Sequence, residues 1–167
     1  MLQASAVLPG EVVETRVTHG LNEVVVARSG LGRLAEIAVS IDEVSLTTYR
    51  ADAVVVATPT GSTGYSLSAG GPILFPEARL LILQPVAAHM SPGTGLILDP
   101  ESTVELQVGR GMESLLSVDG FPEVELTAGA RVVVRRSQYV ARFIRSRPPG
   151  AFYATLNQRL GLSFRSD

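Results

Sequence analysis

The sequence predicts a mainly β protein, a two-layer antiparallel β-sandwich of about a dozen short strands with one short central helix and a C-terminal helix. Many short segments alternate apolar and polar residues, as half-buried strands do. In residues 36–41, for example, Ile37, Val39 and Ile41 fall on one face of an extended chain. Turn dipeptides such as Asp119-Gly120 separate these segments at short intervals, which favours strands joined by tight connections.

Taken in order, the chain opens with residues 1–10, which we interpret as a lead-in without regular structure. Strand patterns follow at residues 11–18, 23–28, 34–41, 43–50, 53–58, 79–83, 95–98, 103–108, 114–118, 123–127, 131–136 and 139–145. In residues 151–160, Phe152, Leu156 and Leu160 recur at helical spacing, and Gly161 is expected to end that helix. No repeat or linker interrupts the 167 residues, so we expect a single domain over residues 1–167.

Composition excludes several classes of function. A formal net charge of −2 gives no electrostatic case for binding nucleic acid. No apolar run reaches the roughly 18 residues that a membrane span requires, so we expect a cytoplasmic protein without a membrane contact. The chain has no cysteine and no lysine, and all 14 basic residues are arginine. This removes disulfides, thiolate metal sites, Schiff-base chemistry and the Walker-type phosphate loop.

The central stretch, residues 52–72, carries the strongest local signal. A continuous apolar run at residues 53–57 predicts a strand that is covered on both faces, and Pro59 ends it. Small residues follow, and Gly70-Gly71 then marks the end of a short helix. Such a strand–turn–helix unit lets a ligand approach the backbone closely. The alternative is a small-residue loop that only turns a corner.

Residues 58–72 read T-P-T-G-S-T-G-Y-S-L-S-A-G-G-P, which resembles the NAD kinase signature T-P-T-G-S-T-A-Y-S-L-S-A-G-G-P. The one difference is Gly64 in place of alanine, and glycine supplies the same amide with more backbone freedom. The resemblance implies that the NAD-binding residues of this stretch are Thr60, Gly61, Ser62, Thr63, Gly64, Tyr65 and Ser68.

A second motif, L-N-E-V-V-V at residues 21–26, lies upstream in the order found in that family. By local pattern alone, Asn22 would cap a turn and Glu23 would be solvated. The resemblance instead implies that both bind the adenosine part of NAD, for which an amide and a carboxylate are suited. It also implies that Asp52 binds the nicotinamide half, although on its own Asp52 reads as an exposed ion pair with Arg50.

Two further segments resemble family motifs. Residues 84–91 are similar to T-P-I-C-P-H-S-L, and the resemblance places Ala87 among the NAD-binding residues. His89 in this segment reads as a structural residue first, and with one other histidine in the chain a metal site is not expected. Residues 118–120 match a V/F-D-G turn, which we interpret as turn chemistry first and as site chemistry second.

The family's G-G-D-G-T motif, which holds the phosphate donor and the proposed base, does not occur in this sequence. The resemblance therefore implies a C-terminal domain only, with no catalytic residue of its own, belonging to a longer enzyme and inactive alone. The intact enzyme would phosphorylate the adenosine 2′-hydroxyl of NAD to give NADP, using ATP or polyphosphate and Mg²⁺. Family members assemble as homodimers or homotetramers, which we expect here as well.

Two alternatives stay open. One is a stand-alone NAD(P)-binding or regulatory module that has no catalytic role. The other is the C-terminal domain of a lipid-kinase relative, which is also a sandwich, although the intact L-N-E and T-P-T-G-S-T-G-Y motifs speak against it.

Overall fold

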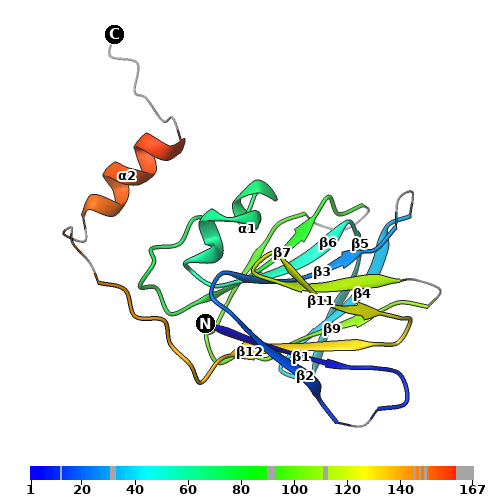
Figure 1. Ribbon diagram of the computed structural model, residues 1–167. Helices are drawn as coiled ribbons and strands as arrows, with labels where there is room; N and C mark the ends of the chain where they lie inside the picture. The colour runs from blue at the N-terminus through cyan, green and yellow to red at the C-terminus, as the bar shows by residue number, and fades with distance from the viewer. Residues whose placement is uncertain are drawn as a thin grey trace.

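The protein folds as a sandwich of two six-stranded antiparallel sheets, as predicted (Figure 1). The structure is a computed structural model that describes residues 1–11, 13–30, 33–89, 93–110, 113–144, 146, 148 and 150–160. The first sheet has the strand order β2 (Thr15–Gly20), β1 (Leu2–Val7), β12 (Arg131–Arg136), β9 (Val104–Val108), β4 (Ala35–Ile41) and β5 (Val44–Ala51). The second has the order β11 (Phe121–Leu126), β10 (Ser114–Val118), β3 (Glu23–Arg28), β6 (Ala53–Ala57), β7 (Leu81–Val86) and β8 (Leu96–Leu98).

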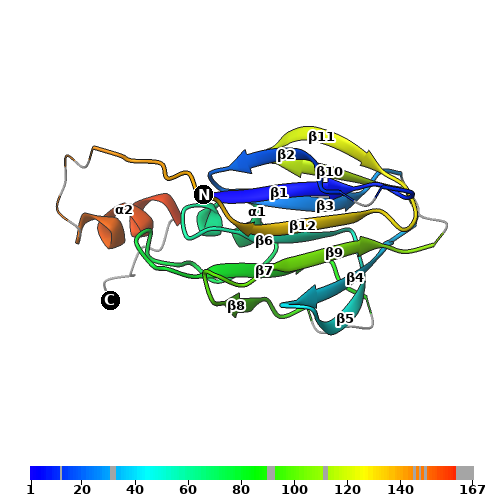
Figure 2. The ribbon, with the colours of Figure 1, turned by 90° about the horizontal axis from the view of Figure 1, so that it is seen from below.

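Three helical elements complete the fold. A 3-10 turn, η1 (Gly61–Thr63), and a single α-helical turn, α1 (Tyr65–Ser68), follow β6 directly. The C-terminal helix α2 (Ala151–Leu160) has the predicted bounds at its described end, whereas Gly161 lies outside the described residues. In Figure 2, α1 and α2 lie at the same end of the sandwich. Among the described residues, no helix is both long and apolar enough to cross a membrane.

The main core lies between the sheets. It is built from alternate residues of each strand, such as Leu106 and Val132 from the first sheet and Val54 and Leu116 from the second. Strand β6 is buried on its other face as well, where Val55 packs in a smaller apolar cluster. The apolar run predicted a strand covered on both faces, and the structure confirms it.

The interpretation of residues 1–10 as a lead-in is wrong. Residues 2–7 form β1, which lies between β2 and β12 and pairs with β12 over its whole length. Leu2, Ala4 and Ala6 face the core and are fully buried. The segment L-Q-A-S-A-V has one β-branched residue, Val7, and no aromatic residue, so its state is set by pairing with a partner about 130 residues away.

The strand expected at residues 139–145 is also wrong. The described part of it, residues 139–144, has no strand and leaves Tyr139, Val140, Phe143 and Ile144 exposed. The residues alternate as those of a strand do, but the described segment pairs with none of the edge strands, β2, β5, β8 and β11. Other differences are shifts of strand ends, of which the largest are at β2, expected at residues 11–18, and β7, expected at residues 79–83.

The burial of a side chain predicts how strongly its truncation lowers the free energy of unfolding. Leu106 is fully buried between the sheets, so Leu106→Ala should lower the free energy of unfolding by about 2–5 kcal/mol. Leu46, on the edge strand β5, is 43% exposed, so Leu46→Ala should have a much smaller effect. Urea unfolding followed by circular dichroism measures both, and equal losses would contradict the assignment of Leu106 to the core.

Candidate functional site

The signature stretch forms a compact turn at the end of β6. The Gly64 amide donates to the Gly61 carbonyl at 2.9 Å and closes η1. Helix α1 ends at Ser68, and Gly70, which has a φ of +84°, lies two residues beyond that end. Ser62 is fully buried; its hydroxyl donates to the Pro59 carbonyl at 2.6 Å and accepts the Leu74 amide at 3.0 Å. Ser62 therefore holds the turn together, and the exposed residues of the stretch are Thr60, Thr63, Gly64, Tyr65, Ser68 and Gly70.

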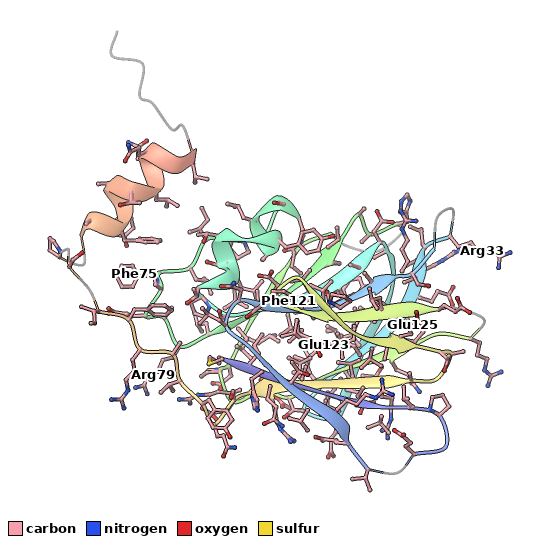
Figure 3. All side chains as sticks on the ribbon, in the orientation of Figure 1. Arg33, Phe75, Arg79, Phe121, Glu123 and Glu125 are labelled. Carbon is pink, nitrogen blue, oxygen red and sulfur yellow. The ribbon has the colours of Figure 1, made fainter. Side chains whose placement is uncertain are left out.

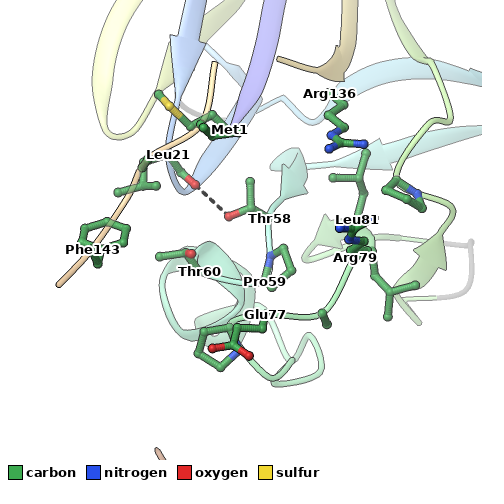
Figure 4. A pocket seen from close by; sticks show the side chains of 16 residues that line it. Met1, Leu21, Thr58, Pro59, Thr60, Glu77, Arg79, Leu81, Arg136 and Phe143 are labelled. Carbon is green, nitrogen blue, oxygen red and sulfur yellow. Dashed lines mark hydrogen bonds between the residues drawn. The ribbon is translucent and has the colours of Figure 1, made fainter. Parts of the chain in front are cut away.

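The second motif lies against this turn. Residues 21 and 22 precede β3, the neighbour of β6 in the second sheet. The Thr58 amide donates to the Asn22 carbonyl at 2.8 Å, and the Thr58 hydroxyl donates to the Leu21 carbonyl at 2.7 Å (Figure 4). The same hydroxyl accepts the Gly61 amide at 3.1 Å. Thr58 therefore joins the two motifs through three hydrogen bonds, to main-chain groups of Leu21, Asn22 and Gly61.

Two glycines allow this close approach. A Cβ atom on Gly61 would lie 2.1 Å from the Asn22 carbonyl oxygen, a distance that no side chain tolerates. A Cβ atom on Gly64 would lie 3.2 Å from Oε2 of Glu23, which is closer than most carbon contacts. The glycine that replaces the signature alanine at position 64 thus gives room to the Glu23 carboxylate.

The Glu23 carboxyl group is partly buried at this site. Its Oε2 atom is buried and accepts no hydrogen bond from the described residues. Burial raises the pKa of the Glu23 carboxyl above its ordinary value of 4.5, and the neighbouring Asp119 carboxylate raises it further. A buried acceptor without a donor costs free energy, which a ligand hydroxyl bonded to this carboxylate would recover.

Asp119 is the residue whose role at this site the sequence did not make plain. It lies in the turn between β10 and β11, and its carboxylate accepts the amides of Leu21, Asn22 and Glu23 at 2.6, 2.7 and 3.0 Å. The V/F-D-G pattern pointed to turn chemistry first and to site chemistry second. Nothing in a pattern of three residues indicates contacts with residues about 97 positions away.

Asp52 and Ala87 are not brought to this cluster. Asp52 precedes β6 and Ala87 follows β7, so both lie at the opposite end of the second sheet, roughly 17 Å from Glu23 at 3.3 Å per strand residue. Asp52 forms an ion pair with Arg28 at 2.6 Å, rather than with Arg50. The φ of Ala87 is +48°, which is rare for a residue with a Cβ atom.

A pocket of about 400 Å³ opens beside the turn (Figure 4). Thr58, Pro59 and Thr60 form part of its wall, and Arg79 and Arg136 also line it. A smaller cavity of about 150 Å³ lies between α1 and α2, with Thr63 in its lining. Phe75 contacts this end of the chain as well, because its ring lies 5.3 Å from that of Phe152 (Figure 3).

In the part of the chain that the structure describes, no group of three or more histidine, aspartate or glutamate side chains could hold a metal ion. The acidic side chains of the site, Glu23 and Asp119, are directed at main-chain groups and at Gly64.

The chain matches known proteins over most of its length. Residues 21–146 match the family described as the ATP-NAD kinase C-terminal domain. An NAD kinase from Chloroflexus aurantiacus is 47% identical over 140 residues, which are 84% of this chain and 51% of the relative. The chain therefore spans about half the length of the curated relatives it matches.

Two solved structures share the fold. The crystal structure of yeast NADH kinase complexed with NADH superposes with a TM-score of 0.89 at 30% identity and covers 99% of this chain and 49% of the yeast chain. An NAD kinase from Archaeoglobus fulgidus in complex with ATP gives a TM-score of 0.75 at 23% identity and covers 94% of this chain and 59% of its own. The latter likeness concerns the fold alone.

The contact between the two motifs makes a prediction about Gly61. Gly61→Ala should lower the free energy of unfolding by about 1–3 kcal/mol, because the new methyl group overlaps the Asn22 carbonyl. Gly30→Ala is the matched control, since a Cβ atom there would meet nothing within 4 Å. Thermal unfolding of both variants checks this, and equal midpoints would contradict the close approach of the two motifs.

Glu23 makes a second prediction. Because its folded pKa lies above the unfolded value of 4.5, protonation of Glu23 stabilises the fold fully below pH 4.5, and this contribution is lost as the pH rises through the raised pKa. At pH 7, Glu23→Gln should therefore raise the midpoint of thermal unfolding, and the gain should vanish near pH 4.

The exposed Glu125 on β11 provides the control substitution, Glu125→Gln, which should leave the midpoint unchanged at both pH values. Differential scanning calorimetry at pH 7 and pH 4 measures all three proteins. A midpoint for Glu23→Gln below that of the wild type at pH 7 would show that the ionised carboxylate stabilises the fold.

Proposed function

This chain belongs to the NAD kinase family as its C-terminal domain, and we propose that it supplies the binding surface for the NAD substrate. One observation carries the proposal: the two motif segments lie in direct contact, and between them lies a carboxylate oxygen that accepts no hydrogen bond from the residues that the structure describes. Contact through Thr58 and Gly61 fixes the main chain on both sides. A rigid main chain that presents the Glu23 carboxylate as a hydrogen-bond acceptor suits a ligand that is rich in hydroxyl groups.

In this proposal Glu23 accepts hydrogen bonds from the ribose hydroxyls of the adenosine half, and Asn22 offers both a donor and an acceptor. Tyr65, whose side chain is 40% exposed, stacks on the adenine ring. The remaining proposed contacts come from the main chain and the exposed hydroxyls of the turn, namely Thr60, Gly61, Ser62, Thr63, Gly64 and Ser68. The proposed contribution of Ser62 is limited to its main-chain carbonyl, because its hydroxyl and its amide are both bonded within the turn.

Asp52 and Ala87 are proposed to bind the nicotinamide half. They are close neighbours, because the Asp52 amide donates to the carbonyl of Val86 at 3.0 Å. Their position at the far end of β6 places them away from the adenosine residues. The family resemblance supports this assignment, and the separation requires the two halves of the dinucleotide to bind at different ends of the second sheet.

The intact enzyme is proposed to transfer a phosphoryl group from ATP or polyphosphate to the adenosine 2′-hydroxyl of NAD, giving NADP. This domain would contribute by positioning the adenosine 2′-hydroxyl of NAD, which accepts the phosphoryl group. The donor site, the general base and Mg²⁺ would belong to the G-G-D-G-T part of the family, which this sequence does not contain. We therefore propose that the 167-residue domain is inactive by itself. By family resemblance, we also propose that the enzyme is a cytoplasmic homo-oligomer.

Binding of NAD to the 167-residue chain tests the proposal. Calorimetric titration with NAD should be saturable, and Asn22→Ala should weaken it by about 5- to 150-fold, the loss expected for 1–3 kcal/mol of buried hydrogen bonding. Asn157→Ala, which removes the one other asparagine from the exposed face of α2, is the matched control. It should bind NAD as tightly as the wild type does.

Two results would contradict the proposal. Absence of NAD binding by the wild-type chain would show that the domain does not supply this surface, and it would favour the lipid-kinase alternative. Equal weakening by both asparagine substitutions would show that NAD binds elsewhere. Binding of NAD by a full-length protein that contains no G-G-D-G-T motif would instead favour the regulatory module.

A further inference from the structure

The Asp119 carboxylate accepts hydrogen bonds from three consecutive main-chain amides. Its Oδ2 atom accepts the Leu21 amide at 2.6 Å, and its Oδ1 atom accepts the amides of Asn22 and Glu23 at 2.7 and 3.0 Å. The Asp119 amide donates in return to the Glu23 carbonyl at 3.0 Å. Four hydrogen bonds therefore connect one residue of the β10–β11 turn to the loop that carries the second motif.

The turn itself does not need this carboxylate. Asp119 and Gly120 have φ values of +49° and +82°, as the two central residues of a tight hairpin require, and asparagine adopts this conformation as readily as aspartate. An aspartate in a turn commonly bonds amides of its own turn. Here both carboxylate oxygens are bonded instead to residues 21–23.

The opposite side of the same loop is held by Thr58. Thr58 donates to the carbonyls of Leu21 and Asn22, whereas Asp119 accepts the amides of the same two residues. Donors and acceptors of the loop are thus satisfied from two sides, by β6 and by the β10–β11 turn. A Cβ atom on Gly20 would lie 2.7 Å from Val118 and 3.1 Å from Oδ1 of Asp119, so the loop also lies directly on the turn.

We propose that Asp119 is a positioning residue of the NAD site: by binding the three amides of residues 21–23, it holds Asn22 and Glu23 against the signature turn. This inference rests on the proposed function for its effect on NAD, whereas the clamp on the loop stands on the geometry alone. Asp119 acts through the main chain and does not itself contact the ligand. Its negative charge beside Glu23 also raises the pKa of that carboxyl.

The test compares Asp119→Asn with Asp42→Asn. Asp42 is matched because its φ is +50°, and its carboxylate accepts the Thr103 amide at 2.8 Å and the Ser102 hydroxyl at 3.0 Å, in the β4–β5 hairpin of the other sheet. Both substitutions keep the size of the side chain and its tolerance for positive φ. They differ in the loop that loses a carboxylate.

Asp119→Asn should increase the amide hydrogen-exchange rates of Leu21, Asn22 and Glu23 at least tenfold. The substitution replaces one accepting carboxylate oxygen by an NH2 group, which cannot accept a hydrogen bond from a main-chain amide. It should raise the dissociation constant for NAD by about 10- to 100-fold, the loss expected for hydrogen bonds to a charged group. The pKa of Glu23, followed by carboxyl NMR, should fall. Asp42→Asn should change the exchange of Thr103 and none of these three quantities.

Unchanged exchange at residues 21–23 in Asp119→Asn would overturn the clamp. Faster exchange with an unchanged NAD dissociation constant would overturn the positioning role. If the wild-type chain does not bind NAD, the proposed function fails, and the exchange rates still decide on the clamp. Should Asp119→Asn not fold, the wild-type protein decides it, because the three amides must exchange more slowly than the amide of the exposed Gly30.

Discussion

Burial of β6 on both faces fixes the place of the turn that carries the signature residues. Val54 and Val56 face the core between the sheets, whereas Val55 packs in the outer cluster with Leu74. Strand β6 is therefore held between β3 and β7 and covered from both sides. The turn that follows it leaves the sheet at a fixed place, and Thr58, the first residue past the strand, is positioned to bond the loop before β3.

The site then follows from main-chain hydrogen bonds rather than from side chains that point into a cavity. Thr58 binds the carbonyls of the 21–22 segment, Asp119 binds its amides, and Gly61 lets the two backbones touch. Between these segments, Glu23 has a buried carboxylate oxygen that has no hydrogen-bond donor in the described part of the chain. Such a group lowers stability and is kept where a ligand completes it, which is the physical argument for a binding role.

Much of the fold could be predicted from the sequence, because alternation and the double-sided valine run are local signals. Strand β1 could not, since its alanines and polar residues become a strand only through β12. At residues 139–144 the opposite error arose: the residue pattern predicted a strand, but the segment does not pair with a strand in the structure. Of the site, the motifs indicated Asn22, Glu23 and the turn, but not the clamp from Asp119, which depends on contacts between distant segments. Nor did they indicate that Asp52 lies at the far end of β6.

We propose that the 21–23 loop and the signature turn together form one surface that binds the ligand. Amide chemical shifts of the ¹⁵N-labelled chain during addition of NAD test it most directly, because they report on each residue separately. We expect the largest changes to fall on Asn22, Glu23 and the amides of η1 and α1, and to saturate together with one dissociation constant. Changes confined to other surfaces, such as the wall around Arg79 and Arg136, or no changes at all, would contradict it.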